Sequence, residues 1–215
     1  AVDAEAVCGL TTLTTLRFMS NEDDEEAGEW VLDFSRLTTL TSVNLEGCFA
    51  VTDRQVQMLS SLTGLTALNL LGCSNLTSEV LLELSSLTAL TTLKLSLPAS
   101  CAEDAAYAEA VCGLTTLTAL SFHAEEDEDG DIVEEVGVWK LDLSRLTTLT
   151  SLNFEQCPAV TDKQMQELSN LTRLTSLDLW CPNVTAEGLL AVKSLTALKT
   201  FNLRDYNMTS DVLRA

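Results

Sequence analysis

The sequence has little of what most catalytic and metal sites are made from. It contains a single histidine, His123, and its seven cysteines include no Cys-x-x-Cys pair. The serine-nucleophile motif Gly-x-Ser-x-Gly, a phosphate-binding loop and a zinc-protease motif are also missing from the sequence. We therefore expect no catalytic residue, no metal ligand and no cofactor, and we expect that the protein is not an enzyme.

Basic residues and long apolar runs are scarce as well. Twelve lysines and arginines stand against 32 acidic residues, which gives a formal net charge of -20. An acidic excess of this size disfavours contact with nucleic acid phosphates or with anionic lipid. No stretch approaches the ~20 consecutive apolar residues of a membrane span. The expected partner is therefore neither nucleic acid nor membrane.

What the sequence has in abundance is repetition. The pattern Leu-Thr-x-Leu-x-x-apolar-x-apolar occurs eight times at intervals of 24 to 32 residues. Residues 4–10 return as residues 108–114, and residues 35–42 return as residues 144–151. We therefore expect one domain over residues 1–215, made of a first half (about 1–104) and a duplicated second half (about 105–215). The first leucine of each repeat is taken as position one: Leu10, Leu37, Leu62, Leu87, Leu114, Leu146, Leu171 and Leu195.

Each repeat predicts a strand followed by a turn and, in several repeats, a helix. Apolar positions seven and nine alternate with polar residues, which is the period of a half-buried strand. Thr52 with Asp53, and Thr161 with Asp162, are natural openings for helices that follow such strands. One unit is too small to bury its own apolar side, so the units must stack. The expected fold is an α/β solenoid with a curved parallel sheet on the concave side and helices and loops on the convex side.

Two segments carry a family resemblance that extends over essentially the whole chain. Leu-Glu-Gly-Cys at residues 45–48 before Val-Thr-Asp at 51–53, and Phe-Glu-Gln-Cys at 154–157 before Val-Thr-Asp at 160–162, resemble the cysteine-containing subtype of leucine-rich repeats. That subtype is familiar from substrate-recognition subunits of ubiquitin ligases. The Leu-Thr-x-Leu-Thr runs also resemble the shorter repeats of bacterial internalins. The resemblance implies a leucine-rich-repeat solenoid with a binding role.

The cysteines indicate the cellular compartment of the protein. Cys48, Cys73, Cys157 and Cys181 recur at one repeat position, and we expect the first three to be buried free thiols. Cys8 and Cys112 occupy equivalent helix ends and are expected to be structural, whereas Cys101 lies outside the pattern. An odd number of cysteines and the absence of a recognisable leader favour an intracellular and cytoplasmic protein.

Two acidic segments interrupt the pattern. Residues 21–29 hold six acidic residues and residues 125–135 hold eight. The second nearly matches a calcium-binding loop, but Val136 stands where the loop needs glutamate. A solvated loop is therefore the favoured interpretation, followed by a contact with a basic partner and then by calcium binding. An alternating run follows each segment and predicts an extended strand-like stretch that covers the convex side. The two runs are Trp30, Leu32 and Phe34, and Trp139, Leu141 and Leu143.

Threonines form two ranks along the chain. Position two is threonine in all eight repeats and position five is threonine in seven, with Lys199 in the eighth. Regular threonine ranks could bind ice, which needs a Thr-x-Thr pattern on a flat strand face. Here the spacing is Thr-x-x-Thr before the strand. We therefore expect the hydroxyls to bind main-chain groups in the turns.

The outward positions six, eight and ten define a candidate docking site on the concave face. Position six is always small and position eight is polar, so the larger residues at position ten should project from the surface. In the second half they include Trp180 and Arg204, residue types that are enriched at binding hot spots. His123 beside Glu155 could form an acid-base pair, although on an open face. The expected partner-binding residues are His123, Glu155, Asp178, Trp180 and Arg204.

These observations favour a non-catalytic module that binds another protein through its concave face. A structural subunit of a larger assembly is the alternative, followed by a calcium- or ice-binding protein. The partner's identity and the oligomeric state stay open at the level of sequence.

Overall fold

A computed structural model describes four parts of the chain, residues 7–18, 33–97, 105–124 and 141–204. Several expectations fall outside these ranges. They concern Trp30, Leu32, Trp139 and Cys101, together with the acidic segments 21–29 and 125–135, the second of which resembles a calcium-binding loop.

Eight parallel strands form one sheet, and each strand pairs with the strand of the next repeat. The spatial order of the strands is therefore their order in the sequence, as a stack of identical units requires. The strands are β1 (Thr15–Arg17), β2 (Ser42–Asn44), β3 (Ala67–Leu70), β4 (Thr92–Leu97), β5 (Ala119–Ala124), β6 (Ser151–Glu155), β7 (Ser176–Leu179) and β8 (Thr200–Leu203).

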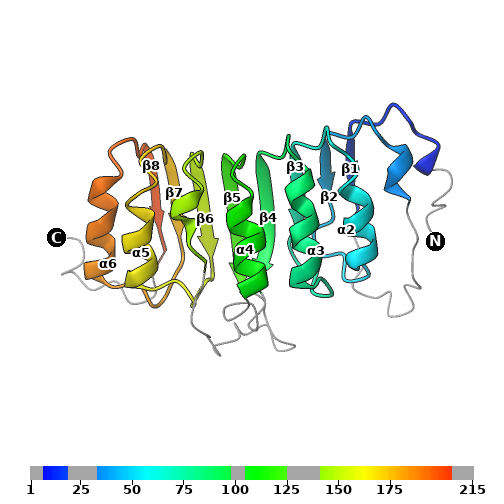
Figure 1. The fold of residues 1–215 in the computed structure, drawn as a ribbon. Coiled ribbons are helices and arrows are strands. Elements are labelled where there is room, and N and C mark those ends of the chain that lie inside the picture. Colours follow the sequence, from blue (N-terminus) through cyan, green and yellow to red (C-terminus); the bar gives the residue numbers. More distant parts are fainter. Residues whose placement is uncertain (1–6, 19–32, 98–104, 125–140, 205–215) are drawn as a thin grey trace.

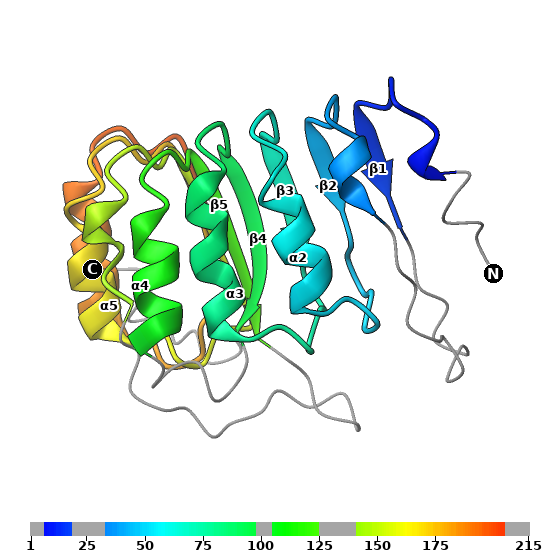
Figure 2. The same ribbon diagram turned by 45° about the vertical axis from the view of Figure 1, so that its right-hand side comes forward.

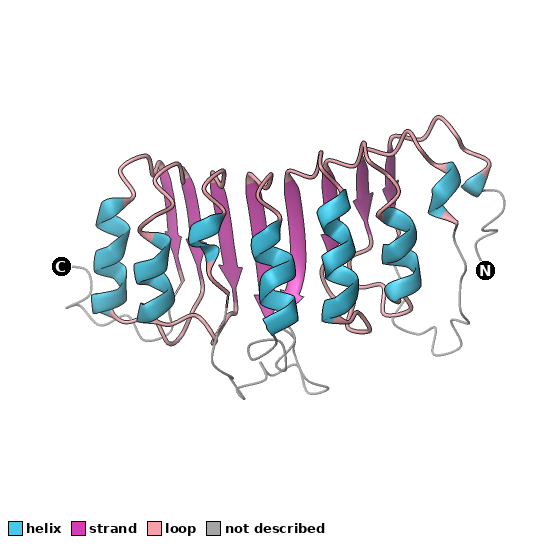
Figure 3. Cartoon of the chain, in the orientation of Figure 1, coloured by secondary structure: helices cyan, strands magenta, loops and turns pink. Residues whose placement is uncertain are grey.

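Helices and short 3-10 turns connect the strands. Figure 1 shows them lined up along one side of the sheet, which we call the helical face; the opposite side is the sheet face. The turned view and the colouring by structure type show the same two layers (Figures 2 and 3). The α-helices are α2 (Asp53–Leu59), α3 (Ser78–Glu83), α4 (Ala105–Gly113), α5 (Asp162–Leu168) and α6 (Ala186–Leu190), and the 3-10 turns are η1 (Phe34–Arg36), η2 (Leu84–Ser86), η4 (Leu143–Arg145) and η5 (Ala191–Ser194).

Leucines between the two layers make the core. Positions one, four, seven and nine are buried in repeats two to seven, as the repeat pattern predicts. Two aromatic residues at position nine, Phe122 and Phe154, stack with ring centroids 5.7 Å apart. Burial of this apolar surface is the main force that holds the repeats together. The expected α/β solenoid, with a parallel sheet on one side and helices on the other, is confirmed. Among the described residues, no helix is long and apolar enough to cross a membrane.

The predicted helix openings are also confirmed. Thr52 and Thr161 are the N-caps of α2 and α5, and each forms a capping box with the glutamine three residues later. In the first box, the main-chain amide of Thr52 donates to Gln55 Oε1 at 3.0 Å. The box satisfies donors that the first helical turn leaves unpaired, so it fixes where the helix begins.

The extended stretch predicted to follow each acidic segment is wrong at its end. Phe34 and Leu143 begin 3-10 turns instead of continuing a strand. Asp33 precedes the first turn and Asp142 the second, and each carboxylate accepts the main-chain amide of the serine two residues later. A local side-chain bond of this kind favours a turn over an extended chain. The described apolar residues of the two runs, Phe34, Leu141 and Leu143, are nevertheless buried, so they do cover the helical side of the core.

Candidate binding surface

Strand register places the outward residues of successive repeats in straight rows on the sheet face. Ser121 of β5 pairs with Asn153 of β6, which pairs in turn with Asp178 of β7. Asn202 of β8 continues this row, and its amide nitrogen lies 3.2 Å from an oxygen of Asp178. The row at position eight is therefore continuous across the second half of the sheet.

Position ten forms a second row beside it. His123 pairs in register with Glu155. The main-chain amide of Trp180 donates to Phe154, and the amide of Arg204 donates to Leu179, so the ladder continues past the strand ends. Arg204 is exposed, while His123, Glu155 and Trp180 are half-buried. The sequence-predicted residues are thus neighbours on one open face, as a regular solenoid requires.

A ladder of threonines at position five keeps the repeats in this register. Each hydroxyl donates to the main-chain carbonyl of the position-five threonine in the preceding repeat, at 2.9 to 3.2 Å. The same carbonyl also accepts the amides of positions five and six of the next repeat, as Thr118 does from Thr150 and Ser151. One oxygen therefore collects three donors at six of the seven steps, and the last oxygen, of Thr175, collects the amides of Lys199 and Thr200 only. The prediction that these hydroxyls bind main-chain groups is confirmed. The position-two threonines are exposed.

Eight similar units, each with a parallel strand, and the leucine core and threonine ladder that join them settle the architecture. The chain folds as a leucine-rich-repeat solenoid. The thiols of Cys48, Cys73, Cys157 and Cys181 occupy the turn after the strand and are buried, as predicted. Cys73 Sγ donates to Leu45 O at 3.2 Å.

Comparison with known proteins gives structural neighbours only. No family model and no curated protein matches the sequence. The fold is similar to internalin C2 from Listeria monocytogenes str. 4b F2365, with a TM-score of 0.48 and 18% identity over 94% of this chain and 74% of that one. It is also similar to internalin F from the same strain, with a TM-score of 0.48 and 22% identity over 84% of this chain and 59% of that one.

One side chain on the leucine-rich-repeat sheet face has an unused acceptor. The Asn153 Oδ1 atom is buried and accepts no hydrogen bond from any described residue. At the same repeat position, Asn44 and Asn69 each accept the amide of the residue two positions later, at 2.9 and 3.1 Å. In the sixth repeat the strand continues to Glu155, so the Glu155 amide, two residues after Asn153, belongs to the strand and does not bind the asparagine side chain. A buried polar atom without a partner is uncommon, and here it lies on the predicted docking face.

His123 has a partner that the sequence did not predict. Its Nε2 atom lies 2.6 Å from Oε1 of Gln156, the residue after Glu155. Gln156 has a φ of 52°, in the left-handed region, whereas Gly47 and Gly72 occupy the corresponding positions of repeats two and three. A non-glycine residue in that region is strained and is a recurrent feature of functional sites. Alignment of the repeats around the two glycines was the signal that could have revealed it.

Charge on the sheet face is balanced, in contrast to the chain as a whole. Of the 32 acidic and 12 basic residues, the described ranges hold 12 acidic and 10 basic ones. The solenoid itself is therefore close to neutral, and most of the negative charge lies in segments outside those ranges. The outward strand positions carry three residues of each sign: Arg17, Lys94, Arg204, Glu46, Glu155 and Asp178. The candidate surface is thus suited to specific polar contacts more than to general attraction of cations.

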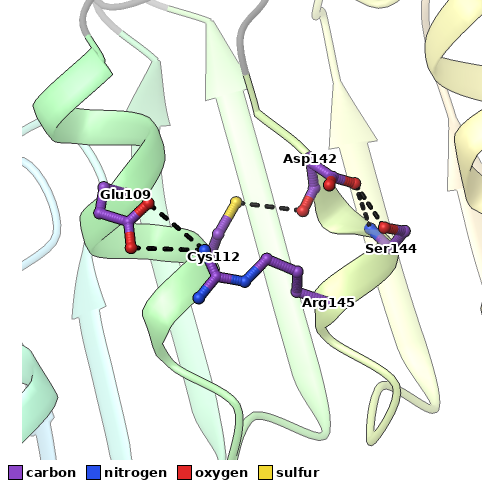
Figure 4. Close-up of polar contacts among 5 residues, drawn as sticks. All are labelled: Glu109, Cys112, Asp142, Ser144 and Arg145. Carbon is purple, nitrogen blue, oxygen red and sulfur yellow. Dashed lines mark hydrogen bonds and ion pairs between the residues drawn. The ribbon is translucent and has the colours of Figure 1, made fainter.

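A second polar cluster, on the helical face, is structural (Figure 4). Cys112 Sγ donates to Asp142 O at 3.2 Å, and Arg145 Nη1 lies 3.3 Å from Glu109 Oε2. These contacts join α4, which precedes β5, to η4, which follows the second acidic segment. Burial raises the pKa of the Cys112 thiol, which keeps it protonated and unreactive. Cys8 repeats the contact in the first half by donating to Asp33 O at 3.3 Å.

Proposed function

We propose that this chain is a non-catalytic module that binds another protein on the sheet face of its second half. The residues proposed to contact the partner are His123, Glu155, Asp178, Trp180 and Arg204. The row at position ten beside the unused Asn153 oxygen is the observation that carries the proposal. The first half differs there, because its asparagine oxygens are already used within the turns.

Each residue in the proposed site offers a different contact. Trp180 supplies a wide apolar surface at low cost in side-chain entropy. Arg204 is exposed at the end of the row and presents a forked donor for a carboxylate or a carbonyl oxygen. A rearrangement of the neighbouring side chains on binding would let the buried Asn153 oxygen accept one hydrogen bond from a donor of the partner. The proposed partner surface therefore combines an apolar patch with an acidic group and a hydrogen-bond donor.

The proposed location is inside the cell, in the cytoplasm. The support is the group of six cysteines that are buried as free thiols in the described ranges. Thiols kept in this form suit a reducing compartment.

One substitution separates binding from packing. Trp180→Ala should weaken affinity for the partner by about 2 kcal/mol, or roughly 30-fold, with little change in the melting temperature. Leu71→Ala changes position ten of the first half and serves as the matched control, which should keep full affinity. The partner would first be isolated from source-cell extract on wild-type protein, and its affinity for the three purified chains would then be measured by calorimetry. A Trp180→Ala protein that melts earlier but binds with unchanged affinity would refute the proposed site.

A further inference from the structure

The two outer repeats of the sheet expose apolar side chains that the inner repeats bury. Phe201 of β8 is 41% exposed, whereas Leu93, its counterpart in the first half, is fully buried. Leu10 is 52% exposed, and its counterpart Leu114 is 4% exposed. Strands β1 and β8 are the two edges of the sheet within the described ranges. Each edge therefore leaves part of the apolar core uncovered, although Leu16 of β1 is only 9% exposed.

The junction between the two halves shows how such edges fit together. There β4, the last strand of the first half, pairs in parallel with β5, the first strand of the second half. The register sets Leu93 opposite Leu120 and Leu95 opposite Phe122, and it buries all four side chains. β8 corresponds to β4 in the duplicated sequence, and β1 corresponds to β5. The junction of β4 and β5 is thus a closed version of the contact that β1 and β8 leave open within the described residues.

The register of β4 and β5 can be applied to β8 of one copy and β1 of another, and the residues that then face each other are compatible. Phe201 would lie opposite Leu16, and Leu203 opposite Phe18, so apolar residues meet apolar residues. Asn202 would lie opposite Arg17, which places no like charges together. Direct apolar pairs of this kind stabilise neighbouring strands.

The same pairing of β8 with β1 would also allow the main-chain hydrogen bonds that join β4 to β5. At the internal junction the amides of Thr118 and Ala119 and the hydroxyl of Thr118 all donate to the carbonyl of Thr91. Thr14 and Thr15 carry the same donors at the start of the sheet. The carbonyl of Lys199 stands at the acceptor position at its end. An exposed strand edge with such unused groups is a template for a further strand.

We propose that a second copy of this chain docks at this edge, so that β8 of one copy pairs in parallel with β1 of the next. The contact is head to tail and joins two different surfaces, so each added copy leaves a new open end. Assembly then extends the solenoid and buries Phe201 and Leu10 as the inner repeats bury Leu93 and Leu114. This proposal does not rest on the proposed docking site for a different protein.

The first test measures mass against concentration for the full chain. Sedimentation velocity over about a hundredfold range of protein concentration should show species that grow beyond the dimer. Phe201→Glu places a charge in the proposed contact and should raise the dissociation constant by at least about tenfold. Phe49→Glu is the matched control, because Phe49 is 51% exposed but lies in a turn after β2. It should associate as the wild type does. A wild-type chain that stays monomeric, or equal loss of association in both variants, would overturn the proposal.

A mixing experiment tests the head-to-tail geometry itself. Leu10→Glu blocks the β1 end and leaves β8 open, while Phe201→Glu blocks the β8 end and leaves β1 open. Each variant alone should be monomeric, and an equimolar mixture should form a dimer and no larger species. Circular dichroism of both variants checks that the solenoid is intact. Two folded variants that stay monomeric when mixed, although the wild type associates, would exclude this pairing.

Discussion

At the scale of single residues, Asn69 and Asn153 occupy the same repeat position and use their side chains differently. Asn69 accepts the amide of Leu71 at 3.1 Å and donates to Glu46 at 3.2 Å. The Asn153 Oδ1 atom accepts no bond from the described residues. The contribution of an asparagine at position eight to stability therefore depends on whether the strand ends there or continues.

This contrast predicts different stabilities for two identical substitutions. Asn69→Ala leaves the Leu71 amide without its acceptor and should lower the free energy of unfolding by about 1 kcal/mol. Asn153→Ala removes an unused buried oxygen and should change the unfolding free energy by less than about 0.5 kcal/mol. Urea denaturation of the two variants checks the difference. If Asn153→Ala were the more destabilising change, Asn153 would have a structural role that the hydrogen bonds do not show.

The thiols after strands β3 and β7 predict a dependence on alkaline pH. Burial raises the pKa of Cys73 to about 12, with a further contribution from the neighbouring Cys48, and burial likewise raises the pKa of Cys181 to about 12. In the unfolded chain these thiols lose their protons near pH 9.0. The folded state holds the protons more tightly, so its stability is full below that pH and falls as the pH rises toward 12.

We therefore expect the unfolding free energy of the wild type to decline between about pH 9 and about pH 12. The double variant Cys73→Ala, Cys181→Ala should show a shallower decline, measured by urea denaturation at each pH. Val51→Ala, a change at a fully buried residue in a nearby turn, should lower stability equally at every pH. Parallel pH curves for the wild type and the cysteine double variant would contradict the assignment.

At the scale of secondary structure elements, neighbouring helices are linked through their first turns. Asp162 of α5 accepts the amide and the hydroxyl of Thr185, the N-cap of α6, at 2.7 and 2.6 Å. Asp53 of α2 makes the same pair of contacts with Thr77, the N-cap of α3. The aspartate that opens one helix thus also fixes where the next one begins.

Gly188 lies close to the link between Asp162 and Thr185. A Cβ atom at Gly188 would overlap the Asp162 carboxylate and lie 2.9 Å from the Asp162 Cα. Gly188→Ala should therefore lower the unfolding free energy by about 1 to 3 kcal/mol. Gly113→Ala is the control, because no atom lies within 4 Å of its added Cβ, and it should leave stability unchanged or slightly higher. Thermal melts of both variants decide the point, and equal melting temperatures would contradict it.

The strands were predictable from the sequence, but not all the turns between them. The alternation at positions seven and nine identified every strand, because burial on one side imposes a period of two. The alternation of Leu141 with Leu143 looked similar but ends in a 3-10 turn, since the Asp142 carboxylate binds the amide of Ser144. Hydrophobic period alone contains no information about such a side-chain bond. The contact of His123 with Gln156 was likewise hidden, because it depends on a left-handed residue outside the strand.

At the scale of the whole molecule, stability should fall from the middle of the sheet toward its edges. Repeats two to seven are covered on both sides, whereas β1 and β8 have one neighbour each. In a solenoid each repeat is stabilised mainly by its neighbours. The division into two halves stays a prediction from the sequence duplication, since the sheet runs through the junction without interruption.

Hydrogen exchange of the monomer provides the measurement. In dilute protein the amides of β1 and β8 should exchange faster than those of β4 and β5, because the outer repeats open with less energy. In concentrated protein, head-to-tail association should slow exchange in both edge strands. Uniform exchange across all eight strands would show instead that the solenoid opens as one unit.

The similar sequence separation of hydrogen-bonded residues in successive repeats has a consequence for the folding rate. The threonine ladder joins residues 25 to 32 positions apart, and no contact in it spans a longer stretch of chain. The entropy lost on closing each loop is therefore nearly the same at every step. Folding can begin at any adjacent pair of repeats and spread outward, so the time needed for nucleation should not lengthen as repeats are added.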